Sequence, residues 1–211
     1  MKKAILFDID GTLLDAHDFI FDAVKYSLNT HGFAYPEDKV SKKAMGKPLL
    51  EFYEVLLPGV DPKELAKTHH EFQQKNFHLI KPFPNTKRIL ADLKNTGFLI
   101  AAVSNRSRES LVSSLKFTGI FKFFDVVFSL DDVVHPKPHK EHLQVALKSL
   151  QVKPGVALMV GDTENDILAG KAARVKTVGV RYGWLGKDIA KHKPDYLIDD
   201  IEELLNILKV A

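Results

Sequence analysis

The sequence predicts an α/β fold built on a parallel sheet, and three observations support this class. Short apolar runs recur along the chain, and between them apolar residues are spaced three and four positions apart, as in amphipathic helices. Polar residues follow directly after several of these runs. About ninety residues separate the first run from the second, whereas one crossover helix needs about a dozen. We therefore expect a Rossmann-like parallel sheet core flanked by helices, with an inserted all-helical domain.

Six apolar runs are the expected strands of this sheet. They are short and do not alternate strictly with polar residues, which is typical of parallel strands buried on both faces. Turn or polar residues bound each run. The expected strands are residues 4–7, 98–103, 125–128, 157–160, 177–180 and 196–198.

The long gap after the first run predicts a helical domain inserted into the core. Asp15 and the stretch 81–84 are candidate hinges, because the two prolines of that stretch stiffen the returning chain. We expect residues 15–81 to form the insertion, and residues 1–14 and 82–211 to form the core. Helical spacing covers residues 19–31, 49–57 and 63–79, punctuated by Pro36, Pro58 and Pro62.

The composition indicates a folded protein and excludes several other classes. Of the 211 residues 45% are hydrophobic, which is enough for a buried core and excludes a disordered chain. Lys and Arg number 30 against 27 Asp and Glu, and the two signs alternate, so no nucleic-acid partner is expected. Because the chain has no cysteine, disulfides and thiolate metal sites are excluded. Any metal must be held by oxygen or nitrogen atoms.

The distribution of apolar residues argues against export and against a membrane span. Lys2 and Lys3 precede an apolar stretch, but Asp8 and Asp10 interrupt it too early for a signal peptide. No apolar run approaches the roughly 18 residues that a spanning helix needs. We therefore expect a cytoplasmic protein with no membrane partner. The oligomeric state, monomer or dimer, stays open.

A first polar cluster, Asp8, Asp10, Gly11 and Thr12, ends the first expected strand. Alternation along an extended strand end places the two carboxylates on the same side. An Asp-Gly pair between apolar runs also favours a hairpin. The residues after Thr12 lead into a helical pattern and not into a returning strand, which weakens the hairpin interpretation.

A second cluster, Ser104, Asn105 and Arg106, ends the second expected strand and opens a helix that reaches about Phe117. An isolated serine at such a position is most often the helix N-cap. A hydroxyl at a helix N-terminus also suits an anion, so capping and anion binding are compatible.

Lys137 follows the third run in a loop, where flanking prolines restrict its motion, although a single loop lysine is usually just solvated.

Two further acids, Asp162 and Asp166, follow the fourth run, the second of them at the start of a helix. Taken separately, each fits a turn or the first turn of a helix. In an open parallel sheet, however, ligands bind outside the carboxyl ends of the strands, and all four clusters occupy that edge. We therefore expect the clusters to meet in one site.

The charges of these residues constrain the chemistry of that site. Four crowded carboxylates need a compensating cation, and hard oxygen ligands without soft ones select Mg²⁺. With this cation, Lys137 and a hydroxyl of Ser104 or Thr12, the site suits phosphoryl transfer. One aspartate can attack phosphorus as a covalent nucleophile. Its neighbour two residues on can act as general acid and base, if nearby negative charge raises its pKa.

These motifs resemble, in the right order and over almost the entire chain, the haloacid dehalogenase superfamily of phosphatases. Residues 7–12, FDIDGT, match its first motif, which implies that Asp8 is the nucleophile and Asp10 the general acid/base. The second and third motifs match Ser104-Asn105 and Lys137-Pro138, which implies contacts to the phosphoryl group. The insertion corresponds to the helical cap of this superfamily.

The same resemblance implies the ligands of the magnesium ion. Residues 161–166, GDTEND, resemble the fourth motif, so Asp162 and Asp166 are expected to hold the metal together with Asp8, Asp166 directly or through water. The backbone carbonyl of Asp10 is a further ligand in this superfamily. The expected cofactor is therefore Mg²⁺.

Further resemblance suggests which reaction to expect. An acid at position 10 argues against the dehalogenating members, and Ile20 stands where the β-phosphoglucomutase branch carries a histidine, which disfavours mutase activity. Residues 167–199 are most similar to phosphoglycolate phosphatases and the related pyrophosphatases. This implies a phosphatase that hydrolyses a small phosphorylated metabolite, a monoester like phosphoglycolate, through an aspartyl phosphate. The alternative within the family is an inorganic pyrophosphatase.

Two positions depart from the pattern of the family. Arg174 stands where glycine usually ends a helix, which costs about 1 kcal/mol if the backbone there is left-handed. Lys140 replaces a frequent proline after Lys137-Pro138. Neither change removes a catalytic group.

Other interpretations remain for single residues of the insertion and for the whole chain. Gly46 and Lys47, with the neighbouring Lys42 and Lys43, either face the leaving group or form a solvated basic face. The histidines, His69, His70 and His78 among them, match no zinc motif, so surface positions are expected.

Two other function classes share these features: a phosphoacceptor like a response-regulator receiver, and a non-catalytic binding protein. A receiver needs a long-lived aspartyl phosphate, which a general base at Asp10 would hydrolyse. Receivers also lack an inserted cap.

Overall fold

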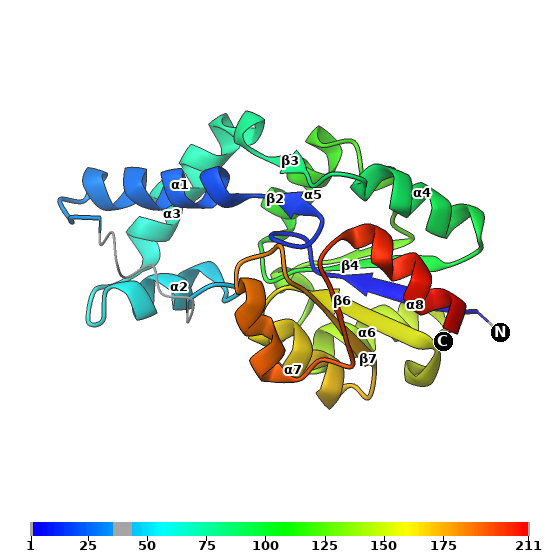
Figure 1. The fold of residues 1–211 in the computed structure, drawn as a ribbon. Helices are drawn as coiled ribbons and strands as arrows, with labels where there is room; N and C mark the ends of the chain where they lie inside the picture. The colour runs from blue at the N-terminus through cyan, green and yellow to red at the C-terminus, as the bar shows by residue number, and fades with distance from the viewer. Residues whose placement is uncertain (1, 36–43, 211) are drawn as a thin grey trace.

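The computed structural model describes residues 2–35 and 44–210, and these form an α/β protein with a six-stranded sheet. The strand order is β5-β4-β1-β6-β7-β8, and every neighbouring pair in this sheet is parallel. Figure 1 shows helices on both sides of the sheet and a helical part extending away from it. The strands are β1 (Ala4–Phe7), β4 (Leu99–Val103), β5 (Val126–Phe128), β6 (Ala157–Gly161), β7 (Lys176–Val180) and β8 (Tyr196–Ile198).

Alternating side chains of the central strand divide the core into two layers. Ile5 and Phe7 of β1 belong to an apolar cluster that includes side chains of α4, α5 and α8. Ala4 and Leu6 point to the opposite face, where α6 and α7 cover them. Both faces are therefore buried, which explains why this strand reads as an uninterrupted apolar run. The flanking helices are α4 (Thr86–Asn95), α5 (Arg108–Phe117), α6 (Glu141–Leu150), α7 (Glu164–Ala172) and α8 (Leu204–Val210).

All six predicted strands are present, with ends shifted by at most one residue. At one such end, the carboxylate of Asp125 accepts a hydrogen bond from the backbone N–H of Ile100 at 2.7 Å, and β5 begins only at the next residue. Short 3₁₀ turns join several elements: Phe121–Phe123, Leu130–Asp132, Pro154–Val156, Gly186–His192 and Ile201–Glu203.

Between β1 and β4 the chain forms a helical insertion, defined here as the described residues 16–35 and 44–80. It contains α1 (His17–Thr30), α2 (Leu49–Leu56), α3 (Lys63–Lys75) and a 3₁₀ turn at Phe77–Leu79. In Figure 1 these helices lie to one side of the sheet. They enclose their own apolar cluster, in which Leu28, Tyr53 and Leu65 are almost fully buried.

The predicted third helix of the insertion is too long. It was expected over residues 63–79, but α3 ends at Lys75 and a separate 3₁₀ turn follows. Asn76 breaks the helix: its φ is −128°, and its side-chain amide donates a hydrogen bond of 2.8 Å to the carbonyl of Phe72. Asparagine competes for backbone groups in this way, which the spacing of apolar residues does not report.

A two-stranded antiparallel pair joins the insertion to the sheet. β2 (Leu14–Asp15) pairs with β3 (Lys81–Pro82), Leu14 opposite Pro82 and Asp15 opposite Lys81. The sequence did not predict this pair, because two-residue strands show no periodicity. The pair lies where the two candidate hinges were expected, and the exact division into residues 1–14 with 82–211 and residues 15–81 stays a prediction. Pro36, Lys42 and Lys43 lie outside the described residues.

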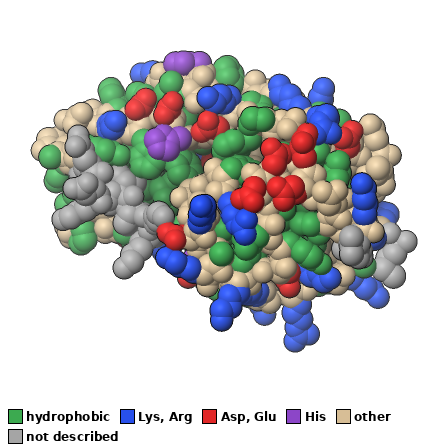
Figure 2. All heavy atoms as spheres, in the orientation of Figure 1, with side chains coloured by type: hydrophobic (Ala, Val, Ile, Leu, Met, Phe, Trp, Pro, Cys, Tyr) green, Lys and Arg blue, Asp and Glu red, His purple; other side chains and the backbone are tan. Residues whose placement is uncertain are grey.

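The two departures from the family pattern lie on the surface of the sheet-forming part. Arg174 follows α7 with a φ of 58°, so the backbone there is left-handed, the conformation that glycine would adopt without strain. Lys140 is exposed and directly precedes α6. The face seen in Figure 2 carries basic and acidic side chains side by side. No helix of residues 2–35 and 44–210 is both long enough and apolar enough to cross a membrane.

Candidate active site

The polar clusters meet at the carboxyl edge of the sheet, because their strands are parallel neighbours. Asp8 follows β1, and its backbone N–H donates to Val160 of β6 at 2.9 Å. Ser104 follows β4, and its N–H donates to Phe128 of β5 at 3.0 Å. The register of the sheet therefore places the four predicted clusters around one point.

Three buried carboxylates form the centre of this site. One oxygen from each of Asp8, Asp162 and Asp166 lies within 4.8 Å of the others. Lys137 reaches the same place, and its side chain is only 2% exposed. Its ammonium nitrogen donates to Asp8 Oδ1 at 2.6 Å, to Asp166 Oδ1 at 2.7 Å and to the carbonyl of Val103 at 2.8 Å. Lys137 is therefore a buried member of the site and not a solvated loop residue.

Hydrogen bonds from neighbouring loops orient two of these acids. Asp162 accepts from the Thr12 hydroxyl at Oδ1, 3.1 Å, and from the backbone N–H of Trp184 at Oδ2, 2.8 Å. Asp166 Oδ2 accepts from the N–H and the hydroxyl of Thr163, at 3.0 and 2.7 Å. Thr163 and Asp166 together form a capping box at the start of α7. Asp166 is therefore both a helix cap and a member of the acid cluster.

The charges of the cluster are coupled. Burial raises the pKa of Asp8 to about 7; Lys137 opposes this shift and the carboxylate of Asp166 adds to it. Burial, with Asp8 and Asp166, also raises the pKa of Asp162 well above its ordinary value. Burial lowers the pKa of Lys137, but Asp166 and Asp8 outweigh burial and raise it overall. When all three acids are ionised, the ammonium of Lys137, which contacts Asp8 and Asp166, balances only one of their charges.

The donor set of this cluster fits a magnesium ion. The ligands are all carboxylate oxygens, the hard donors that Mg²⁺ prefers. Asp8, Asp162 and Asp166 would therefore be the residues that hold such an ion. A divalent cation would also supply positive charge to a cluster in which burial, and then the neighbouring carboxylates, raise the pKa values of Asp8 and Asp162.

Asp10 does not belong to this cluster by its side chain. Its carboxylate pairs with the guanidinium of Arg106, with Nη1 3.0 Å from Asp10 Oδ1, and the carboxylate is 12% exposed. The backbone carbonyl of Asp10 accepts a hydrogen bond from the Trp184 indole at 3.1 Å. Alternation along the strand end therefore brings the two predicted catalytic acids to one edge but gives them different cationic partners, Lys137 for Asp8 and Arg106 for Asp10.

The second cluster differs in one respect from its predicted role. The helix α5 begins at Arg108 with Ser107 as N-cap, so Ser104 is not a helix cap. The Ser104 hydroxyl instead accepts from the N–H of Arg106 at 3.3 Å, and the residue is 2% exposed. The capping interpretation was wrong because a turn separates the strand from the helix.

Asn105 connects the site to the insertion. Its side-chain amide donates to the carbonyls of Lys137 and Gly46, both at 2.8 Å, and its carbonyl oxygen accepts from the N–H of Lys137 at 3.1 Å. Gly46 has a φ of +76°, and a Cβ there would lie 2.9 Å from the Thr163 hydroxyl. Glycine is therefore required for this close approach between the insertion and the site.

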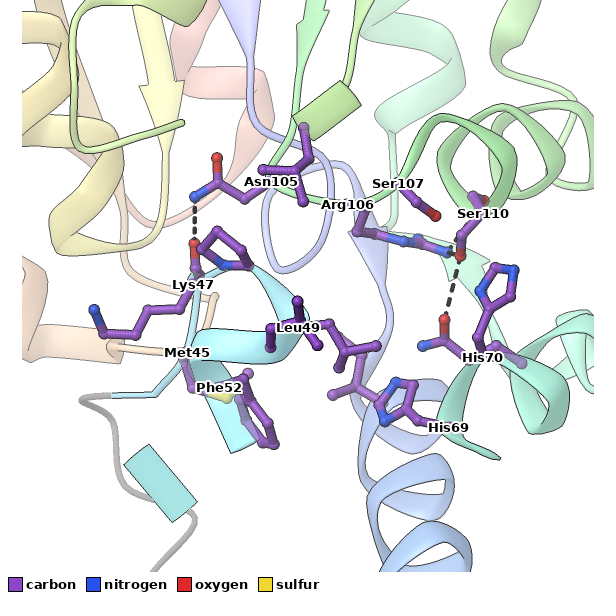
Figure 3. A pocket seen from close by; sticks show the side chains of 16 residues that line it. Met45, Lys47, Leu49, Phe52, His69, His70, Asn105, Arg106, Ser107 and Ser110 are labelled. Atoms are coloured by element: carbon purple, nitrogen blue, oxygen red, sulfur yellow. Dashed lines mark hydrogen bonds between the residues drawn. The ribbon is translucent and has the colours of Figure 1, made fainter. Parts of the chain in front are cut away.

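A cavity of about 200 Å³ lies between the insertion and the residues that follow β4. Apolar side chains from the insertion line one side, among them Met45, Leu49 and Phe52. The other side is polar and includes Asn105, Arg106 and Ser110 (Figure 3). Of the predicted insertion residues, Gly46 and Lys47 both line this cavity, and Lys47 also pairs with Glu51 at 3.5 Å.

Sequence reasoning gave one residue of the site no role, missed a second and misplaced a third. Arg106 was named in the second cluster, directly after the Ser104-Asn105 motif, but its contact to Asp10 was not expected. Trp184 reaches the site from a loop that is 174 residues away from Asp10 in the chain, and no spacing reports such a contact. His69 was expected at the surface but is 2% exposed, because α3 packs it against Tyr53, whose hydroxyl lies 3.0 Å from His69 Nδ1.

Two curated relatives match almost the whole length of this chain. The pyrophosphatase PpaX of Anoxybacillus flavithermus is 36% identical over 99% of this chain and 98% of its own length. PpaX of Bacillus velezensis is 35% identical over 98% of this chain and 96% of its own.

Solved structures and a family model point the same way. A predicted phosphoglycolate phosphatase from Haemophilus somnus shares the fold with a TM-score of 0.88 and 25% identity, covering 98% of both chains. A haloacid dehalogenase-like family hydrolase from Streptococcus pneumoniae has a TM-score of 0.86 and 24% identity, also over 98% of both chains. Residues 5–180 match the family model described as haloacid dehalogenase-like hydrolase. The chain belongs to this family.

Proposed function

We propose that the protein is a magnesium-dependent phosphatase that hydrolyses a small phosphorylated metabolite through an aspartyl phosphate. The observation that carries this proposal is the position of the Lys137 ammonium, which bridges Asp8 and Asp166 inside the buried acid cluster. A buried cation beside a carboxylate nucleophile and a metal-type acid cluster is suited to bind and stabilise a phosphoryl group. The relatives named as phosphatases and pyrophosphatases support the same reaction class.

In the first step, a carboxylate oxygen of Asp8 attacks phosphorus. The bond between phosphorus and the leaving oxygen breaks, and Asp10 donates a proton to that oxygen. In the second step, water attacks the phosphorus of the aspartyl phosphate while Asp10 takes a proton from it. Inorganic phosphate leaves, and Asp8 is again a free carboxylate.

The surrounding residues of the chain position these groups. When bound, Mg²⁺ supplies positive charge that neutralises the phosphoryl oxygens and the acid cluster. Asp8, Asp162 and Asp166 would hold it, with the backbone carbonyl of Asp10. We propose that the phosphoryl group is bound by Ser104, Asn105, Thr12 and Lys137. The hydroxyl of Thr12 also orients Asp162. Arg106 orients the carboxylate of Asp10 at this edge of the sheet through a hydrogen bond of 3.0 Å.

The cavity next to Arg106 favours a small leaving group that carries negative charge. Its volume of about 200 Å³ suits only a small molecule, and Arg106 and Lys47 supply positive charge on its wall. Phosphoglycolate offers a carboxylate to such a site and is our first candidate substrate. Inorganic pyrophosphate offers a phosphate and is the second, favoured by the PpaX relatives.

The test is release of inorganic phosphate, with and without Mg²⁺, from phosphoglycolate, pyrophosphate, glucose 6-phosphate and AMP. We expect magnesium-dependent turnover with a preference for one of the first two compounds. Asp8→Asn should be inactive, and Asp61→Asn, which changes an exposed aspartate, should keep wild-type activity. No turnover of any compound, with a phosphorylated protein stable for many minutes, would instead support the receiver-like function. Binding without phosphorylation or turnover would support a non-catalytic binding protein.

A further inference from the structure

Trp184 donates hydrogen bonds to both halves of the candidate site. Its backbone N–H reaches Asp162 Oδ2 at 2.8 Å, and its indole N–H reaches the carbonyl of Asp10 at 3.1 Å. The first acceptor belongs to the acid cluster, and the second is the backbone of the loop that carries the two catalytic acids. One residue thus connects the loop after β7 to the loop after β1.

Two glycines permit this close packing. A Cβ at Gly11 would lie 2.5 Å from Trp184 Cδ1 and Nε1 and 2.2 Å from Asp162 Oδ2. A Cβ at Gly183 would lie 2.3 Å from Asp162 Cβ and 2.5 Å from the carbonyl of Gly11. Side chains at these positions would force the two loops apart. The loops therefore pack closely around the indole and the side chain of Asp162.

The opposite side of the indole faces the insertion. Its ring stacks on His17 with centroids 5.7 Å apart, and the ring of Phe21 meets it edge-on at 5.6 Å. Both partners belong to α1, and Trp184 packs against the apolar cluster of the insertion. The same side chain therefore touches the insertion on one side and the catalytic loop on the other.

From this arrangement we propose that Trp184 is a positioning residue that couples the seating of the insertion to the metal-binding geometry of the acid cluster. This inference rests on the magnesium site of the proposed function. When α1 packs against the indole, the indole N–H holds the Asp10 carbonyl and the backbone N–H holds Asp162. Bound Mg²⁺ in turn stabilises the packed position of α1, because coupling between two equilibria is reciprocal.

The first measurement is Mg²⁺ binding by calorimetry. Trp184→Phe keeps an aromatic ring against α1 but removes the indole N–H, and we expect its dissociation constant for Mg²⁺ to rise about tenfold, the lower end of the effect of outer-shell partners. Phe21→Ala removes a contact from the insertion side alone and should weaken Mg²⁺ binding in the same direction. Tyr26→Ala is the matched control, since Tyr26 lies on the same helix but packs on Phe72.

A second measurement, amide hydrogen exchange, detects the coupling in the insertion. In the wild type and in Tyr26→Ala, Mg²⁺ should slow amide hydrogen exchange in α1, and this protection should be lost in Trp184→Phe and Phe21→Ala. Since Trp184 is the single tryptophan of the chain, its fluorescence should also change when Mg²⁺ is added to the wild type.

Wild-type Mg²⁺ affinity and wild-type α1 protection in both variants would overturn the inference and leave the proposed function intact. If the wild-type protein itself bound no Mg²⁺, the magnesium site and this inference would both be wrong.

Discussion

The ammonium nitrogen of Lys137 lies 2.6 Å from Oδ1 of Asp8, although 129 residues separate the two in the chain. The pair is almost completely buried, and the charges around Lys137 raise its pKa, so the ammonium stays protonated. A buried charge this close to the proposed nucleophile indicates a role in the proposed reaction, because charge pairs are costly to bury and seldom needed for stability.

Replacing this ammonium should stop the reaction without a general loss of structure. We expect Lys137→Met to lower kcat at least about 100-fold, the effect of losing one preorganised donor to the reacting group. Lys140→Met is the matched control, because Lys140 is exposed and three residues away. Phosphate release under saturating Mg²⁺ measures both. Activity of Lys137→Met within threefold of the wild type would remove this lysine from the mechanism.

Arg106 should decide which leaving group is preferred. A hydrogen bond to a charged partner is worth about 1.5–3 kcal/mol, so its loss should lower the preference for phosphoglycolate over 2-hydroxyethyl phosphate at least about tenfold in Arg106→Met. The two compounds differ in the charge of the leaving group, and the ratio of their kcat/KM values cancels any common effect through Asp10. Arg108→Met, at a more exposed arginine, should keep the wild-type ratio. An unchanged ratio in Arg106→Met would place the leaving group elsewhere.

The buried His69 should make the protein less stable in acid. Burial lowers its pKa from 6.5 to about 3, and the nearby charge of Arg106 adds to this shift. Between these two values the unfolded chain binds a proton that the folded chain does not. The free energy of unfolding therefore falls as the pH drops from about 6.5 towards about 3, by up to about 1.4 kcal/mol for each pH unit.

Urea unfolding at several pH values measures this effect. Wild-type stability should fall more steeply below about pH 6.5 than the stability of His69→Gln, which carries no titrating imidazole. His78→Gln, at an exposed histidine, is the matched control and should follow the wild type. Parallel curves for the wild type and His69→Gln would show that His69 does not couple to folding.

Arg174 offers a test of backbone strain at the end of α7. Its φ of 58° costs a residue with a side chain about 1 kcal/mol relative to glycine. We expect Arg174→Gly to raise the free energy of unfolding by up to about 1 kcal/mol, reduced by the greater freedom of glycine in the unfolded chain. Kinetic constants should not change, since no catalytic group is altered. A lower free energy of unfolding in Arg174→Gly would show that the arginine side chain stabilises the fold by more than its left-handed backbone destabilises it.

The sequence predicts the sheet of this protein well, because its strands are buried on both faces. Ala4–Phe7 is apolar at every position and is recognisable without any knowledge of its neighbours. The predicted site also follows from topology: polar residues after parallel strands must lie at one edge. That argument brings Asp8, Asp162 and Asp166 together without any distance information.

What the sequence does not predict are contacts that depend on packing between distant segments. The hydrogen bonds of Trp184 to Asp10 and Asp162 join loops whose approach depends on two glycines and on the whole sheet between them. His69 lies on a mostly polar helix, and only the packing of α3 against the rest of the insertion buries it. The end of α3 at Asn76 depends on a local side-chain hydrogen bond.

The central claim is that Asp8 becomes phosphorylated and that Asp10 then helps water to remove the phosphoryl group. The most direct measurement is intact-protein mass after acid quenching of a reaction with Mg²⁺ and the best substrate of the panel. We predict one phosphoryl group per chain at early times in the wild type and none in Asp8→Asn. In Asp10→Asn the phosphorylated form should persist, with turnover slowed about 10² to 10⁴-fold. Phosphate release by Asp8→Asn at the wild-type rate, or rapid turnover by Asp10→Asn without a phosphorylated protein, would contradict this mechanism.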